Sequence, residues 1–67
     1  MARLAEIKDA VEPGAGQPPK TVYVNPSNVI AIEPMPNGTR ITLNGGHVYQ
    51  TTANLNDVLA SIQTAMV

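Results

Sequence analysis

The chain has 67 residues, which is enough for one domain, residues 1–67, with only a small buried core. It has no cysteine, so disulfides cannot supplement that core, and one histidine with five scattered carboxylates predicts neither a metal site nor a cofactor. A net charge of −1 provides no basic patch in one copy of the chain, so we expect no nucleic-acid partner.

The first predicted element, residues 2–11, has an apolar pattern that fits two structures. Leu4, Ile7 and Val11 recur at helical spacing, whereas residues 3–8 alternate imperfectly, as a strand does. We interpret the segment as a strand, because the next apolar run would pair with it, and we keep the helix as the alternative. Residues 12–19 are rich in Pro and Gly, which predicts a loop.

A strand and a corner follow this loop. Residues 21–25 alternate and predict a strand with Val22 and Val24 on one face. Pro26 fixes its own φ and the Asn25 side chain can bond neighbouring backbone groups, so a turn is expected here. The simplest role of Asn25 is to form this corner, and its alternative role is a ligand contact.

The next segment predicts a hairpin. Residues 29–33 are β-branched and continuous enough to predict a buried strand. Pro34 and Pro36 are expected to end it, because neither can donate a hydrogen bond to a neighbouring strand. The sequence Pro-Asn-Gly at 36–38 is typical of a hairpin turn.

Two further strands and a second tight turn are predicted. Residues 39–44 alternate cleanly, with Ile41 and Leu43 facing inward. Asn-Gly-Gly at 44–46 predicts a type I′ turn, because these residues accept positive φ. Residues 47–51 return as the last strand, which we place at an edge of the sheet without the usual protection by Lys or Pro.

The hydrophobic period then changes to that of a helix. Apolar residues recur along one stripe, at Leu55, Val58, Leu59, Ile62 and Met66. Asn54 is placed to cap this helix and Asp57 to favour its positive end, and Leu59 and Ile62 are expected at the centre of its contact with the sheet. The predicted fold class is α+β: a small antiparallel β-meander of three to four strands with one C-terminal amphipathic helix.

Residues 22–33, 38–46 and 55–62 together resemble the small flagellar FlbD/SwrD family. The shared features are an aromatic-hydrophobic-Asn-Pro strand leading to Ile-Glu, a hydrophobic-Thr-Leu hairpin with Gly, and a short C-terminal helix. The resemblance covers roughly residues 21–62 and implies a non-catalytic role in swarming motility and flagellar motor output. A longer Pro-rich segment, 12–19, replaces the family's tight Asn-Gly turn, and Gly-His-Val at 46–48 replaces its basic stretch.

The candidate site is a surface built around the only two aromatic residues. Tyr23 and Tyr49 each lie opposite their neighbouring valines, so we expect them to share the sheet face that the helix leaves open. Arg40 and His47 would join them there, giving the composition of an interface. A solvated strand residue is the simpler interpretation of Arg40, and His47 has no catalytic partner nearby in sequence, so no enzyme is predicted.

These observations predict a binding or assembly module that acts through protein–protein interaction, as a cytoplasmic homo-oligomer joined at a sheet edge or at the tyrosine face. No apolar run approaches the roughly 20 residues of a transmembrane helix, so no membrane insertion is expected. The alternative is a phage-type protein, either an inhibitor of a host defence protein or an oligomeric sponge for an anionic small molecule such as a nucleotide. Its anion contacts would be Lys20, Arg40, Thr51 and Thr52.

Overall fold

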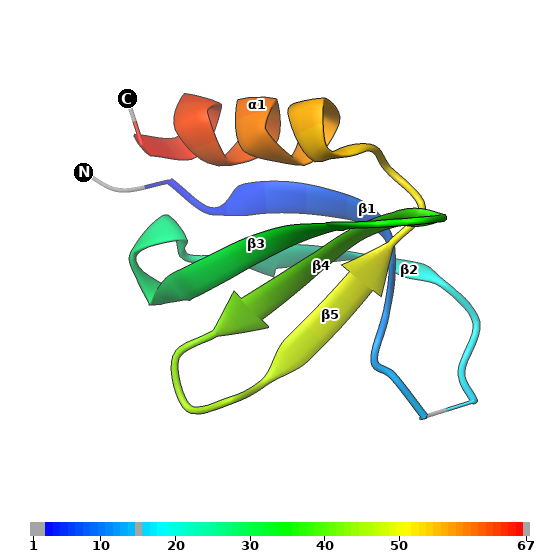
Figure 1. Ribbon diagram of the computed structural model, residues 1–67. Helices are drawn as coiled ribbons and strands as arrows, with labels where there is room; N and C mark the ends of the chain where they lie inside the picture. The colour runs from blue at the N-terminus through cyan, green and yellow to red at the C-terminus, as the bar shows by residue number, and fades with distance from the viewer. Residues whose placement is uncertain (1–2, 15, 67) are drawn as a thin grey trace.

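The computed structural model describes residues 3–14 and 16–66, which form one antiparallel sheet with a helix on one face (Figure 1). The elements are β1 (Ala5–Val11), β2 (Lys20–Val24), the 3₁₀ turn η1 (Pro26–Asn28), β3 (Val29–Met35), β4 (Gly38–Leu43), β5 (Val48–Thr51) and α1 (Leu55–Met66). The order across the sheet is β2-β1-β5-β4-β3. The predicted α+β class is confirmed, and the sheet has five strands rather than three or four.

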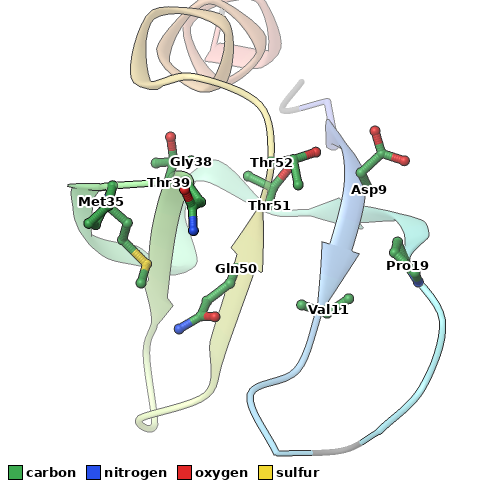
Figure 2. A pocket seen from close by; sticks show the side chains of 11 residues that line it. Asp9, Val11, Pro19, Met35, Gly38, Thr39, Gln50, Thr51 and Thr52 are labelled. Atoms are coloured by element: carbon green, nitrogen blue, oxygen red, sulfur yellow. The ribbon is translucent and has the colours of Figure 1, made fainter.

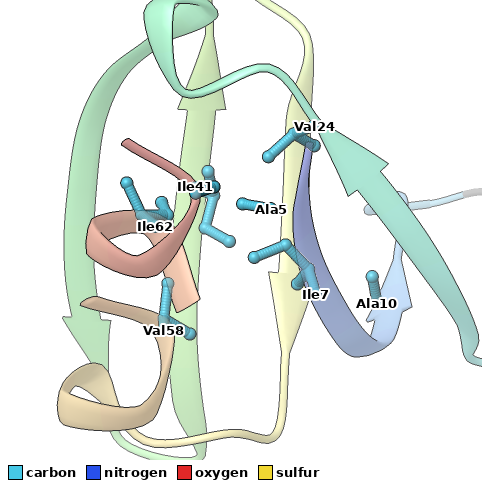
Figure 3. Close-up of a cluster of buried hydrophobic side chains, with 8 residues drawn as sticks. Ala5, Ile7, Ala10, Val24, Ile41, Val58 and Ile62 are labelled. Atoms are coloured by element: carbon cyan, nitrogen blue, oxygen red, sulfur yellow. The ribbon is translucent and has the colours of Figure 1, made fainter. Parts of the chain in front are cut away.

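The additional strand is β1, so the strand interpretation of the first segment is confirmed over Ala5–Val11; residue 2 lies outside the described residues. Hydrogen bonding to β2 on one side and β5 on the other favours the extended chain over a helix. Ala5 and Ile7 are buried beneath the helix (Figure 3), and their alternate spacing suits a strand with one face against the core.

The corner between β2 and β3 forms as its sequence predicts. Pro26 opens η1, and the Asn25 side-chain oxygen accepts hydrogen bonds from the Ser27 backbone N–H at 3.0 Å and the Ser27 hydroxyl at 2.7 Å. The side chain of Asn25 therefore serves as a cap for this turn.

The prediction of a buried strand at 29–33 is wrong. β3 is an edge strand that continues to Met35, and Ile30 is 64% exposed at a register shift. Pro34 lies within β3, opposite Thr39. An edge strand tolerates proline because one of its sides has no partner strand to receive the missing N–H.

The prediction that residues 47–51 form an edge strand is also wrong, because β5 lies between β4 and β1. Ala10 and Val11 of β1 pair with the side of β5 that the sequence predicts to be without a partner strand. The β4–β5 turn also differs from type I′: Gly45 has a φ of 91°, Gly46 donates to Leu43 at 3.0 Å, and Asn44 does not have positive φ. Of the two central residues of this turn, 44 and 45, only the second has positive φ, which is the pattern of a type II turn; Gly46, with a φ of 86°, closes it.

The helix begins where predicted, with the Asp57 backbone N–H donating to the Asn54 side chain at 2.8 Å. Its buried residues are Val58, Ile62 and Ala65, at positions i, i+4 and i+7 (Figure 3). Leu59 is only half-buried and Met66 is 69% exposed. The buried stripe is therefore rotated from the predicted one toward Ala65, and Ala5 of β1 is buried beneath this side of the helix (Figure 3). In residues 3–14 and 16–66 no helix has the length and apolar character needed to cross a membrane.

Candidate functional site

The sheet face away from α1, here called the outer face, carries the candidate site. Arg40 stands opposite Gln50 on β4 and β5, and Gln50 stands opposite Val11 on β1. Residues opposite each other in an antiparallel pair point to the same face. Because Ile41, the neighbour of Arg40, is fully buried in the core, these three side chains point outward.

An apolar groove of about 410 Å³ occupies one half of this face (Figure 2). Its walls come from the end of β1, the residue before β2, the β3–β4 hairpin and β5 with the residue after it. The side chains that line it include Asp9, Val11, Pro19, Met35, Pro36, Asn37, Gln50 and Thr52. Only the sheet order brings these elements together, since β1 and β5 are neighbours in space and distant in sequence.

A charged hollow of about 500 Å³ occupies the other half. Arg40 makes a two-pronged contact with Glu33, with Nε 3.3 Å from one carboxylate oxygen and an Nη donating to the other at 3.3 Å. His47 lies 3.3 Å from Glu12 through Nε2, an ion pair when the imidazole is protonated. Gln50 lines both the groove and the hollow, so the two form one continuous surface.

The prediction that the two tyrosines share a face is wrong. Tyr23 lies opposite Glu6 on the outer side of β2, is 60% exposed, and donates to the Glu6 carboxylate at 3.3 Å. Tyr49 lies opposite Ile41 and packs against the core from the inner face. Its ring contacts His47 edge-on, with ring centroids 4.8 Å apart.

The four predicted anion contacts do not converge within one chain. The Thr51 hydroxyl is buried and already donates to the Lys8 carbonyl at 2.5 Å and accepts from the Ala53 N–H at 3.1 Å. Thr52 lines the apolar groove and Arg40 lines the charged hollow, where Glu33 neutralises it. Lys20 is exposed at the start of β2 and lines neither cavity.

Sequence reasoning missed several residues of this surface. Glu12 lies in the predicted loop, where the sequence gives no sign of its contact with His47. Gln50 carries one sequence signal, its alternation with the buried Thr51. Met35 follows Pro34, where the sequence predicts the end of the strand, so the sequence does not predict its outward position on β3. Within the described ranges, no group of three His, Asp or Glu side chains comes together as metal ligands.

Comparison with protein-family models, with curated proteins and with solved structures finds no match to this chain in any of the three. The resemblance to the FlbD/SwrD family therefore rests on the sequence features given above.

Proposed function

We propose that this chain is a non-catalytic, cytoplasmic module that binds a protein partner through the outer face of its sheet, in the manner expected for an FlbD/SwrD-like protein. The observation that carries the proposal is the junction at Gln50, where the apolar groove meets the charged hollow. An apolar centre beside charged and polar groups is the usual anatomy of a protein interface.

The size of the molecule supports a protein partner. A standard interface covers about 800 Å² on each partner, which is roughly a fifth of the 4423 Å² surface of this chain. α1 covers one face of the sheet and leaves the outer face open (Figure 1). The Arg40–Glu33 ion pair and the His47–Glu12 contact are both exposed enough to exchange partners with charged groups on a second protein.

Self-association is the second part of the proposal, at the place where the two ends of the described chain meet. The Arg3 N–H donates to the Ala65 carbonyl at 3.3 Å, which brings the two ends of the described chain together. The neighbouring side chains, Leu4 and Met66, are 61% and 69% exposed. We call this pair the apolar end. It is favoured over a sheet edge because Lys20 on β2 and Pro34 on β3 oppose edge-to-edge pairing.

Site-specific photo-crosslinking in the native host tests the outer face. Gln50 is replaced by a photoreactive phenylalanine analogue, and Gln63, exposed on α1, is replaced in a matched control. We expect one predominant crosslinked protein from position 50 and none from position 63. Equal crosslinking from both positions, or no crosslinked protein from position 50, contradicts the proposal.

A further inference from the structure

Asp9 holds an uncommon position at one end of the apolar groove. Between the pairs Ile7–Val22 and Ala10–Lys20, β1 contains one more residue than β2, so β1 bulges here. Asp9 has a φ of 55°, in the left-handed region that aspartate and asparagine tolerate better than other residues with a side chain. A bulge of this kind redirects a side chain. Asp9 on β1 and Thr52, the residue after β5, lie at the same end of the groove (Figure 2).

The carboxylate of Asp9 has no basic partner within 4.0 Å in the described part of the chain. The adjacent Lys8 lies instead 4.0 Å from Glu6. Among residues 3–14 and 16–66, Asp9 is also the only charged residue that lines the groove. This contrasts with the charged hollow, where both carboxylates, Glu12 and Glu33, already have a basic side chain beside them.

The apolar part of the groove comes from Val11, Pro19, Met35 and Pro36, and uncharged polar side chains, among them Asn37 and Gln50, complete its walls. A hydrocarbon stem gains from contact with such walls, and a positive charge at its end gains from the carboxylate. A neutral apolar side chain would leave the charge of Asp9 uncompensated beside it, and an acidic one would be repelled. The side chain that best fits this groove therefore carries a positive charge at the end of an apolar stem.

We propose that the apolar groove takes an arginine or lysine side chain from the protein partner, with the methylene stem along the apolar walls and the cation at Asp9. This inference rests on the proposed function, because the basic residue belongs to the protein bound at the outer face. The volume of about 410 Å³ falls within the range of pockets that hold small ligands.

Amide chemical-shift titration of the labelled full chain with short blocked peptides tests the inference. The probes are acetyl-Gly-Arg-Gly-amide, its lysine counterpart and the citrulline peptide, which keeps the shape of arginine without its charge. We expect saturable shifts at Asp9, Val11 and Thr52 with both basic peptides, and a Kd on the order of millimolar for one side chain. The citrulline peptide should bind about fivefold more weakly, as an ion pair at a surface allows.

The decisive variant is Asp9→Asn, which removes the charge and retains a residue suited to the left-handed conformation. It should bind the arginine peptide about fivefold more weakly. Glu6→Gln changes the net charge equally away from the groove and should bind as the wild type does. Equal affinity of the wild type and Asp9→Asn, equal binding of citrulline and arginine, or no saturable shift near Asp9 would overturn the inference.

These results are distinguishable from failure of the proposed function. Crosslinking from position 50 without Asp9-dependent peptide binding retains the outer face as the interface and rejects the basic side chain. Loss of both rejects the interface itself.

Discussion

Thr51 and Thr52 are adjacent in sequence and have different surroundings. Thr51 is 5% exposed, and its hydroxyl joins the Lys8 carbonyl of the β1 bulge to the Ala53 N–H before the helix. The bulge removes Lys8 from regular strand pairing, so this hydroxyl supplies a donor to its carbonyl. Thr52 is exposed at the rim of the apolar groove. The same residue type is thus structural at one position and available for a partner at the next.

Thr51→Val should lower the free energy of unfolding by about 1–3 kcal/mol, because it removes two part-buried hydrogen bonds of the Thr51 hydroxyl, to the Lys8 carbonyl and from the Ala53 N–H. Thr52→Val removes the same hydroxyl from an exposed position and should change the free energy by less than about 0.5 kcal/mol. Urea unfolding of the two variants provides the measurement. Equal stability of the two would show that the Thr51 hydroxyl contributes no net stabilisation.

At the scale of elements, small residues allow two close contacts: that of the β3–β4 hairpin with β5 and that of α1 with β1. A side-chain carbon added at Gly38 would lie 1.9 Å from the Thr51 carbonyl oxygen, so only glycine permits the hairpin to approach β5 this closely. Ala5 on β1 is similarly small and lies buried beneath α1 (Figure 3). The core is correspondingly thin, and each large buried side chain in it contributes a large share of the stability.

The helix stripe gives a graded prediction. Ile62→Ala removes a residue buried at the centre of the contact and should cost about 2–5 kcal/mol. Leu59→Ala should cost less, because Leu59 is half-buried, and Met66→Ala should change stability little when the protein is a monomer. Thermal and urea unfolding at low protein concentration measure the series. A larger loss of unfolding free energy for Leu59→Ala than for Ile62→Ala would show that Leu59, and not Ile62, lies at the centre of the contact between helix and sheet.

At the scale of the whole molecule, the exposed apolar groups fall into separate regions. The outer face holds the groove, whereas Leu4 and Met66 lie at the joined ends of the chain. Both termini lie at one end of the molecule, beside η1 and the start of β3 (Figure 1). A small domain with little core gains stability when such a surface is covered by a second copy.

We expect a dimer in light scattering coupled to size-exclusion chromatography, with twice the 7.1 kDa mass of one chain. Leu4→Lys combined with Met66→Lys should shift the mass to that of a monomer, because two charges would be buried in the contact. Ala60→Lys with Gln63→Lys adds the same charge to exposed helix positions and should leave the dimer intact. A wild-type mass near 7.1 kDa at micromolar concentration would contradict self-association.

The sequence by itself determined the local structure. The 3.6-residue period and Asn54 located the helix, the turns at 25–28 and 36–38 located two corners, and alternation oriented Ile41 inward and Arg40 outward. These features depend on residues within one turn or one strand, so their signals are contiguous in the chain. The α+β class follows from them.

Only the tertiary structure decided the strand order and therefore the site. Alternation indicates which residues of a strand share a face, and it does not indicate which face is buried. The sequence therefore predicts an outward Tyr49, whereas its pairing with the buried Ile41 places it on the inner face. Nothing local indicates that β1 pairs with β5 and makes β3 the edge. The groove at Asp9 and the contact between Glu12 and His47 depend on that long-range pairing, because residues more than thirty positions apart become neighbours only when the sheet closes.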